Sequence, residues 1–472
     1  MTNMTTGKVI QRSWMDLNGL RLDSGPYLSG AFEARVALER LQARKEPLHK
    51  VTLGGLDGII NAGRFPRTWV NDLNYGIPFL SSTDILQADL SRVSLIAKSA
   101  VAQNEKLLIR EGWTLITRSG TIGRMAYSRP DMDGLACTED VLRVIPDPER
   151  IPPGYLYAYL SSRYGVPMIV SGTYGAVIQH IEPRHIADLP VPRLGEAIER
   201  EVHNLVSEAA RLRAVSSSLF IEGTSKIFST LGIVDSQRHI WYQDQRRLGF
   251  NVKSNELRTH RALNYDPRYV DVQKIIKGDR FSYLGEICDP NFFGSGIIFK
   301  RIDADPEFAV RLVGQREAFQ VRPEGRWISK ASIEGLGLIV PTGTTLIAAH
   351  GTLGETELYC RSVYATERTS EYAFSGDFVR CVPLEDHILS GYLFAFLRSE
   401  TAFRMLRCIS TGSKQQAPQP SLLWELPIPR LVKTDEEYIH NLIQQGSHAF
   451  DKSLHLEEEA WQIVEHAIQE GS

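Results

Sequence analysis

Two loops in the first half of the sequence carry side chains that suit contact with a nucleic acid. The segment TRSGTIGR at 117–124 holds Arg118 and Arg124, whose guanidinium groups can donate paired hydrogen bonds to phosphate or to guanine. Its Ser119 and Thr121 are short hydrogen-bond donors, and its glycines allow a close backbone approach. The segment SGTYGAVIQH at 171–180 offers four further groups: Thr173, Tyr174, Gln179 and His180.

Two loops in the second half offer comparable chemistry with different side chains. AAHGTLGE at 348–355 supplies His350 and Thr352, and STGSKQQAPQ at 410–419 supplies a polar cluster: Ser413, Lys414, Gln415 and Gln416. Glutamine can bond adenine through two hydrogen bonds, and lysine can contact phosphate. The run QREAFQVRPEGRWISK adds four cations: Arg316, Arg322, Arg326 and Lys330. Together these residues are consistent with a basic groove, although tight hairpin turns with solvated surface charges would use the same residue types.

Catalytic patterns are missing from the sequence. CDPNFFGSG at 288–296 resembles the cofactor loop of S-adenosylmethionine-dependent amino-methyltransferases, but it has an extra Asn291 and no catalytic motif with paired prolines accompanies it. His180 and His185 are separated by Pro183, which breaks any helix that would place both on one face. There is no phosphate-binding loop with lysine and no nucleophile elbow. We therefore expect no active site, no metal and no cofactor in this chain.

The sequence contains an internal repeat. LITRSGTIG at 115–123 matches LIAAHGTLG at 346–354 with a spacing of 231 residues. GYLYAYLSS at 154–162 matches GYLFAFLRS, and LPVPR at 189–193 matches LPIPR, both with a spacing of 237. RLDSGPY at 21–27 matches RALNYDPRY at 261–269 less closely. Four markers in the same order indicate a duplication.

Each copy should be a mixed α/β domain. Short β-branched runs bounded by glycine and proline predict strands: VTLGG and IPFLSS in the first copy, SYLGEI and FAVRLV in the second. GYLYAYL and GYLFAFL predict short helices whose aromatic side chains pack in the core rather than stack on bases.

A long helix is expected after each proline marker, because apolar or small residues recur there at alternating spacings of four and three. The seam residues of the first helix are Ile198, Val202, Leu205, Ala209, Leu212, Ser216 and Leu219. Those of the second are Ile439, Leu442, Gly446, Ala449, Ser453, Leu456, Ala460, Ile463 and Ala467. This pattern predicts an antiparallel coiled-coil pair related by a pseudo-two-fold axis, each helix about 50 Å long. Two amphipathic helices packed on their own domains are the alternative.

The expected α+β architecture therefore has two similar mixed α/β domains joined by a pair of long helices. The predicted boundaries are a first domain at 1–194, its helix at 195–230, a linker and the start of the second repeat at 231–260, a second domain at 261–431 and its helix at 432–472.

Composition places the chain among ordinary globular proteins. It has 472 residues, 43% hydrophobic content and a net charge of −3. Residues 434–470 carry a net −8, which leaves the remainder mildly basic and compatible with nucleic-acid binding. The five cysteines include no C-x-x-C pair, and the first residues lack the apolar core of a signal peptide. The sparse, unpaired cysteines fit a reducing cytoplasm, where we expect this protein. No run of 18 apolar residues occurs, so we expect no membrane span.

The paired markers make the chain resemble the DNA specificity (S) subunits of type I restriction–modification systems. The family pattern G-D-x-L followed by G-x-x-G is matched at 112–123, with Trp113 in place of the aspartate, and again at 343–354. The family's L-P-[IV]-P segment is matched at 189–192 and 426–429, but the Glu-Gln that usually follows is absent. That departure leaves open which methyltransferase partner docks here.

The resemblance implies a non-catalytic subunit that reads a two-part, asymmetric sequence in double-stranded DNA, with one domain for each half-site. It further implies paired helices that set the spacer length and dock the modification subunits. Those subunits would bring S-adenosylmethionine and the adenine methyltransferase chemistry, and a motor-nuclease subunit would perform restriction, which is a phage defence.

Three alternatives stay open. The chain could serve a related fused or two-component restriction system or another phage-defence complex. It could be a scaffold that uses its helices for protein assembly without DNA. It could also hide a methyltransferase in its second copy, in which case the isolated chain would bind the cofactor.

Overall fold

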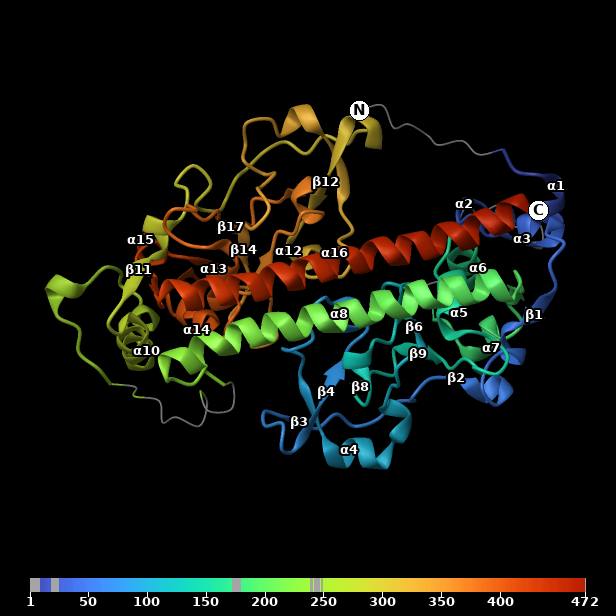
Figure 1. Ribbon diagram of the computed structural model, residues 1–472, viewed down its shortest axis with the longest axis horizontal. Coiled ribbons are helices and arrows are strands. Elements are labelled where there is room, and N and C mark those ends of the chain that lie inside the picture. The colour runs from blue at the N-terminus through green and yellow to red at the C-terminus, as the bar shows by residue number, and fades with distance from the viewer. Residues whose placement is uncertain are drawn as a thin grey trace. The chain divides into compact units, whose positions relative to one another are not determined.

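The computed structural model describes residues 9–17, 25–171, 180–237, 241, 247 and 249–471. These residues form two compact units (Figure 1). Unit 1 comprises residues up to 86, 93–214 and 452–472, and unit 2 comprises 87–92 and 215–451. Thr173, Tyr174 and Gln179, and much of the RLDSGPY marker, lie outside the described residues.

The described residues of unit 1 form three short sheets and the helices that cover them. Its strands are β1 Lys45–Pro47, β2 Ile59–Ile60, β3 Trp69–Val70, β4 Gly76–Leu80, β5 Leu95–Ala97, β6 Thr114–Thr117, β7 Met125–Tyr127, β8 Ala136–Cys137, β9 Val141–Val144 and β10 Pro190–Pro192. Its helices are α1 Arg12–Leu17, α2 Gly25–Leu28, α3 Ala31–Arg40, α4 Lys98–Gln103, α5 Pro153–Leu160, α6 Gly165–Ser171 and α7 Pro183–Ile186. Helix α8 Glu196–Leu231 begins in this unit.

The sheets of unit 1 hold the loops of interest at their edges. One has the order β2-β9-β6-β7 and is antiparallel throughout. The second has the order β3-β5-β4-β8, in which β4 and β8 are parallel. Strand β1 pairs with β10, the proline marker, and Tyr155 and Tyr159 of α5 are fully buried in the core.

Unit 2 repeats this architecture. Its strands are β11 Phe281–Tyr283, β12 Ala309–Val313, β13 Arg326–Ser329, β14 Thr345–Ala348, β15 Ser362–Tyr364, β16 Ala373–Phe374, β17 Phe378–Cys381, β18 Ser410–Gly412, β19 Gln416–Pro418 and β20 Pro427–Pro429. Its helices are α10 Pro267–Lys277, α11 Leu284–Ile287, α12 Gln315–Ala318, α13 Ser390–Leu397, α14 Glu400–Cys408 and α15 Pro420–Trp424. Helix α16 Lys433–Glu470 begins here and ends in unit 1.

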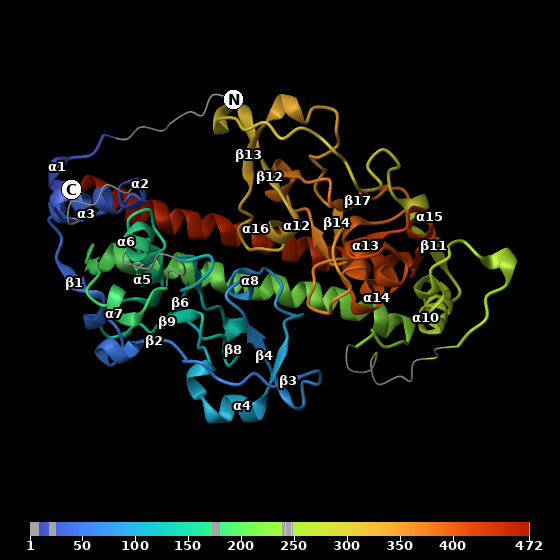
Figure 2. The same ribbon diagram turned by 180° about the vertical axis from the view of Figure 1, so that it is seen from behind.

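The larger sheets of unit 2 have the orders β15-β14-β17 and β13-β12-β16. Strands β12, β13, β14 and β17 are labelled in Figure 2. The β12–β16 pair is parallel, as is the β4–β8 pair of unit 1. The proline marker β20 pairs with β11, as β10 pairs with β1.

The duplication extends to individual hydrogen bonds. The Gly154 amide donates to Nδ1 of His203 on α8 over 3.1 Å, and the Gly391 amide donates to Nδ1 of His440 on α16 over the same distance. The Tyr155 hydroxyl donates to the Pro192 carbonyl, and the Tyr392 hydroxyl donates to the Pro429 carbonyl. Each bond recurs 237 residues later, so both domains are attached to their helices in the same way.

A buried arginine supports one turn in each unit. Arg143 on β9 donates to the carbonyls of Thr138 and Val141, over 2.8 and 2.6 Å. Arg380 on β17 donates to the carbonyls of Ser375 and Phe378, over 2.7 and 3.0 Å. Burial lowers the pKa of both guanidinium groups, that of Arg380 to about 10. These arginines fix the turns that lead into β9 and β17.

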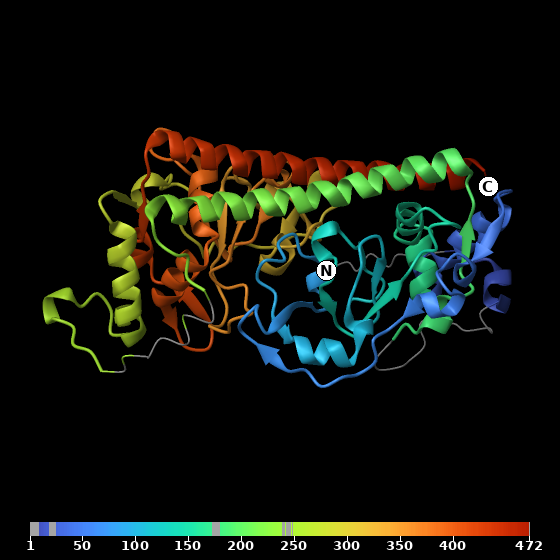
Figure 3. The same ribbon diagram turned by 60° about the horizontal axis from the view of Figure 1, so that its bottom comes forward.

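Helices α8 and α16 contact each other within each unit, running in opposite directions (Figure 3). In unit 1, Arg213 forms two hydrogen bonds with Glu457, over 3.0 and 2.7 Å, and both side chains are buried. In unit 2, Gly446 lies so close to Phe220 that an added Cβ would be 2.6 Å from the ring. The small residue allows this approach.

The expected seam residues are all buried or half-buried: Ile198, Val202, Leu205, Ala209, Leu212, Ser216 and Leu219 on α8, and Ile439, Leu442, Gly446, Ala449, Ser453, Leu456, Ala460, Ile463 and Ala467 on α16. A second stripe on each helix is also buried, including Val206 and Ile443, which join the cores of their own units. Each helix therefore packs both on its neighbour and on its own domain.

Two strand expectations were wrong. VTLGG at 51–55 forms no strand beyond an isolated bridge at Thr52, because Gly54 and Gly55 adopt positive φ angles of 70° and 73°. SYLGEI is extended only in its first residues and then turns into α11. The aromatic helices are confirmed as α5 and α13, and their aromatic side chains are buried.

All five cysteines are buried and free. Burial raises the pKa of the Cys137 thiol to about 11 and that of the Cys360 and Cys408 thiols to about 12. Within the part of the chain that the structure describes, no group of three metal-ligating side chains occurs. None of the described helices combines the length and apolar character needed to cross a membrane.

Candidate nucleic-acid interface

The first candidate loop is the β6–β7 hairpin connection at 118–124. Thr117 closes it: its amide donates to the Arg124 carbonyl over 2.9 Å, and its hydroxyl oxygen accepts from the Arg124 amide over 3.1 Å. Gly120 and Gly123 have φ angles of 71° and 82°, which suit glycine in a tight turn. The segment therefore forms a tight hairpin turn, but the solvated charges of that alternative expectation are wrong for Arg118.

Arg118 is held by the surrounding chain. Its Nε donates to the Ile181 carbonyl over 3.2 Å, its Nη1 donates to the Glu139 carbonyl, and its Nη2 pairs with the Glu182 carboxylate. Only 13% of its side chain is exposed. In this geometry Arg118 ties the hairpin to the 180–182 segment. Thr121 is exposed at the tip, whereas Ser119 and Arg124 are half-buried.

These bonds bring the hairpin beside the segment that precedes the proline marker. The Ile181 amide also donates to the Arg118 carbonyl over 3.3 Å. His180 is half-buried there, and its buried Nδ1 has no hydrogen-bond partner among the described residues. The described part of both sequence-predicted loops of unit 1 therefore lies at one edge.

The same juxtaposition occurs in unit 2. The Gln416 amide donates to the Gly351 carbonyl over 2.7 Å, and the Gly351 amide donates back over 3.3 Å. This bridge joins the β14–β15 hairpin to the β18–β19 hairpin. Three side chains of the β18–β19 turn are exposed: Ser413, Lys414 and Gln415. The Gln416 side chain is buried and donates to the Gly412 carbonyl over 3.2 Å, so it shapes the turn.

Part of the basic run reaches the same edge. The Gln315 side chain at the start of α12 holds the His350 backbone with two hydrogen bonds, over 2.9 and 3.1 Å. The neighbouring Arg316 is exposed, and so is Thr352, whereas Arg322 is half-buried. The His350 ring lies 3.4 Å from the Asp377 carboxylate. Arg326 pairs with Asp303 instead, and Lys330 is exposed.

Sequence reasoning missed one cation at the edge of unit 1. Arg67 bonds the Glu139 carboxylate over 2.9 Å and the Thr138 hydroxyl over 3.2 Å. Burial raises the pKa of Glu139, but hydrogen bonds from the backbone, Arg67 and Thr138 outweigh it and lower that pKa overall. The alternation of arginine and aromatic residues in RFPRTW at 64–69 is the sequence signal that could have found this group.

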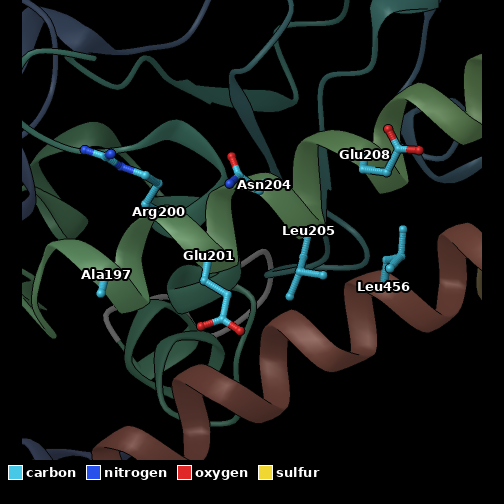
Figure 4. Close-up of a pocket in the computed structure, with 7 residues that line it drawn as sticks. All are labelled: Ala197, Arg200, Glu201, Asn204, Leu205, Glu208 and Leu456. Atoms are coloured by element: carbon cyan, nitrogen blue, oxygen red, sulfur yellow. The ribbon is translucent and has the colours of Figure 1, made fainter.

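A separate cavity lies along the helices of unit 1 rather than at these loops. It has a volume of about 440 Å³, and Figure 4 shows the residues that line it: Ala197, Arg200, Glu201, Asn204, Leu205, Glu208 and Leu456. Leu205 of α8 and Leu456 of α16 lie between the two helices. A mostly apolar groove of this kind suits a protein partner better than DNA.

The chain is similar to solved structures of S subunits. No family model and no curated protein matches it. A type I restriction–modification S subunit from M. genitalium is 12% identical, with 91% of this chain and 96% of that chain covered and a TM-score of 0.35. The HsdS subunit from Thermoanaerobacter tengcongensis is 13% identical, with 91% and 97% covered and a TM-score of 0.26.

A third structure, described as showing complex assembly and conformational transition of a type I R-M system, has 13% identity, 91% and 98% coverage and a TM-score of 0.26. The sequence motifs resemble the same family.

Exposed polar side chains gather at both edges. Exposed hydroxyl, amide and ammonium groups at Thr121, Thr352, Lys414 and Gln415 can donate or accept hydrogen bonds. The scaffold beneath them is rigidly bonded in both units. Such an arrangement suits recognition of a polar, anionic surface.

Proposed function

We propose that this chain is the DNA sequence-recognition subunit of a type I restriction–modification complex. The observation that carries the proposal is one scaffold built twice, with the same hydrogen bonds in both copies and different side chains on the loops. Two copies of one scaffold with different loop side chains suit the recognition of two different DNA sequences. Phosphate contacts would position each unit, and the exposed loop side chains would read bases.

The target is then a two-part, asymmetric sequence, with one half-site for each unit. Helices α8 and α16 form an antiparallel coiled coil with pseudo-two-fold symmetry, and their length sets the unread spacer. Support comes from the repeated attachment of each domain to its helix and from the close helix contacts at Gly446 and at the Arg213–Glu457 pair.

The chain is non-catalytic in this proposal. Modification subunits bring the methyltransferase chemistry and its S-adenosylmethionine, a motor-nuclease subunit brings restriction, and the complex works in the cytoplasm. The groove beside Leu205 and Leu456 is the candidate docking surface for a modification subunit. Arg200, Glu201 and Glu208 border it and could pair with charges on the partner.

The test is DNA binding by the full chain co-purified with its modification subunits. We expect selection of one bipartite sequence from randomised duplex DNA, with an affinity that falls steeply as salt rises. Sequence-specific methylation of host DNA by the complete system, read by methylome sequencing, should give the same motif. A complex that binds no duplex DNA at any salt concentration would favour the scaffold alternative.

A further inference from the structure

The hairpins of the two units differ by an insertion. The β6–β7 connection runs from 118 to 124, whereas the β14–β15 connection runs from 349 to 361. The repeat spacing is 231 residues up to Gly354 and 237 from Ser362 onward, so six residues have been added within this connection. The β14–β15 connection, whose tip is residues 352–357, is therefore longer than the β6–β7 connection of unit 1.

Two arginines of the buried helix α14 hold the inserted loop. Arg404, whose side chain is 3% exposed, bonds both carboxylate oxygens of Glu355 over 2.7 Å each. Arg407 donates to the carbonyls of Leu353 and Gly354 over 2.6 and 2.8 Å. Paired hydrogen bonds between guanidinium and carboxylate fix direction as well as distance. The tip is thus anchored in its middle rather than only at its ends.

Further bonds close the loop. The Glu357 amide donates to the Gly354 carbonyl over 3.0 Å and forms a turn, and the Tyr359 hydroxyl bonds the Ser410 hydroxyl over 2.8 Å. The second of these bonds links the insertion to the β18–β19 hairpin, which carries the exposed Lys414. The loop is preorganised before any ligand arrives.

Unit 1 has no such anchor at the equivalent positions. The residues 237 positions before Arg404 and Arg407 are Pro167 and Val170, which are apolar. Val170 lies against Gly123, where an added Cβ would be 2.5 Å from its Cγ2. The short hairpin is therefore packed on α6, whereas the long hairpin is bonded to α14. The arginine anchor is a specific feature of the second unit.

The exposed side chains of the tip suit base edges better than phosphates. Thr352, Leu353, Thr356 and Glu357 are exposed, and no lysine or arginine occurs between 351 and 358. Threonine can bond several base edges, leucine can contact a thymine methyl group, and a glutamate accepts from the cytosine amino group. Phosphate contacts would fall to the neighbouring cations Arg316 and Lys414.

We propose that residues 352–357 read base edges in the major groove of one half-site, with Arg404 and Arg407 as the positioning residues that hold them. This proposal rests on the proposed function. It assigns sequence discrimination in unit 2 to the uncharged and acidic tip, and affinity to the cations beside it.

The experiment selects bound sequences from a pool of randomised duplex oligonucleotides, using the full chain with its modification subunits. Thr356→Ala and Glu357→Gln should each relax the preference at one or two positions of a single half-site by about tenfold. The slope of affinity against salt should stay unchanged, because no phosphate contact is lost. Lys414→Gln should instead weaken binding to all sequences and reduce that slope.

The anchor is tested separately from the tip. Arg404→Lys keeps the charge but loses the paired hydrogen bonds, so it should relax the same positions as the tip variants. Thr342→Ala, at the opposite end of β14, is the matched control and should leave both half-sites intact. Thermal unfolding of each variant separates misfolding from altered reading.

The outcomes are distinguishable. If the wild-type complex selects a bipartite sequence and the tip variants select the same one with the same stringency, the proposal is overturned while the recognition function stands. If the wild-type complex selects no sequence, both fail. A change confined to one half-site at constant salt slope supports the proposal.

Discussion

Arg143 and Arg380 are the residues whose chemistry is most constrained by their surroundings. Each is a fully buried cation that donates to main-chain carbonyls at the turn before its own strand. A charge removed from water is tolerated only when its donors are satisfied. The turn backbone and the guanidinium therefore depend on each other, and the turn in unit 1 also accepts the Arg118 amide at the Asp140 carbonyl, beneath the candidate loop.

Replacing Arg143 by methionine should lower the free energy of unfolding by roughly 3 kcal/mol, because several buried carbonyls lose their donor. Denaturant titration followed by tryptophan fluorescence measures this. Arg150, whose side chain is 58% exposed, provides the control, and Arg150→Met should change the value by less than about 0.5 kcal/mol. Equal effects of the two substitutions would contradict the supporting role of Arg143.

His203 and His440 should make stability depend on pH. Burial lowers the pKa of both rings below the usual 6.5. Nδ1 of each ring accepts a hydrogen bond from a glycine amide. The unfolded chain then binds protons more readily than the folded chain. The stabilisation is fully present above about pH 6.5 and is lost as the pH falls through the lowered pKa.

The double substitution of His203 and His440 by glutamine should flatten the pH dependence of the unfolding free energy between neutral and mildly acidic conditions. Replacing His448, which is exposed on α16, by glutamine should preserve the wild-type slope. An unchanged slope in the double variant would mean that other groups bind the protons.

Several of these residues were readable in the sequence. His-Asn-Leu recurs at 203–205 and 440–442, and VLRVIP at 141–146 recurs as FVRCVP at 378–383, both at the spacing of 237. They were missed because a histidine in a helix and an arginine in a strand pattern usually indicate exposed positions. The partners of Arg118 could not be foreseen either, since Glu139 and Glu182 are distant in sequence.

At the scale of elements, the heptad pattern predicts the long helices, whereas alternation of polar and apolar residues does not predict most of the strands. Strands such as β2, β3, β8 and β16 contain only two residues each, which is too short for a period of two to be seen. The second buried stripe on α8 and α16 was also missed, because a heptad seam explains only one contact surface per helix.

Gly446 is the element-scale test of the close helix contact. Leucine at this position would overlap the Phe220 ring and the Ser216 carbonyl, which lie 2.6 and 3.3 Å from an added Cβ. We expect Gly446→Leu to lower the free energy of unfolding by about 2 kcal/mol, although leucine is the better helix former. Denaturant titration measures the change. Gln445→Leu, one residue earlier and exposed, should have little effect. A neutral Gly446→Leu would show that the helices do not pack closely there.

At the scale of the whole molecule, recognition and spacing should be separable. Deleting one heptad from both α8 and α16 removes about 10 Å of helix, which corresponds to roughly three base pairs. The selected spacer should shorten while both half-sites keep their sequences. Exchanging residues 1–194 for another recognition domain should alter one half-site only. Selection from randomised duplex DNA reads both outcomes, and altered half-sites after the heptad deletion would refute this division of labour.

The inaccessible thiols make the protein well suited to site-directed labelling. The native thiols are buried, and those of Cys137, Cys360 and Cys408 have raised pKa values, so they should react slowly with maleimide dyes. A cysteine introduced at the surface of each unit would therefore take up nearly all of the fluorophore. Energy transfer between two such dyes would then report any change in the distance between the labelled positions when duplex DNA is added.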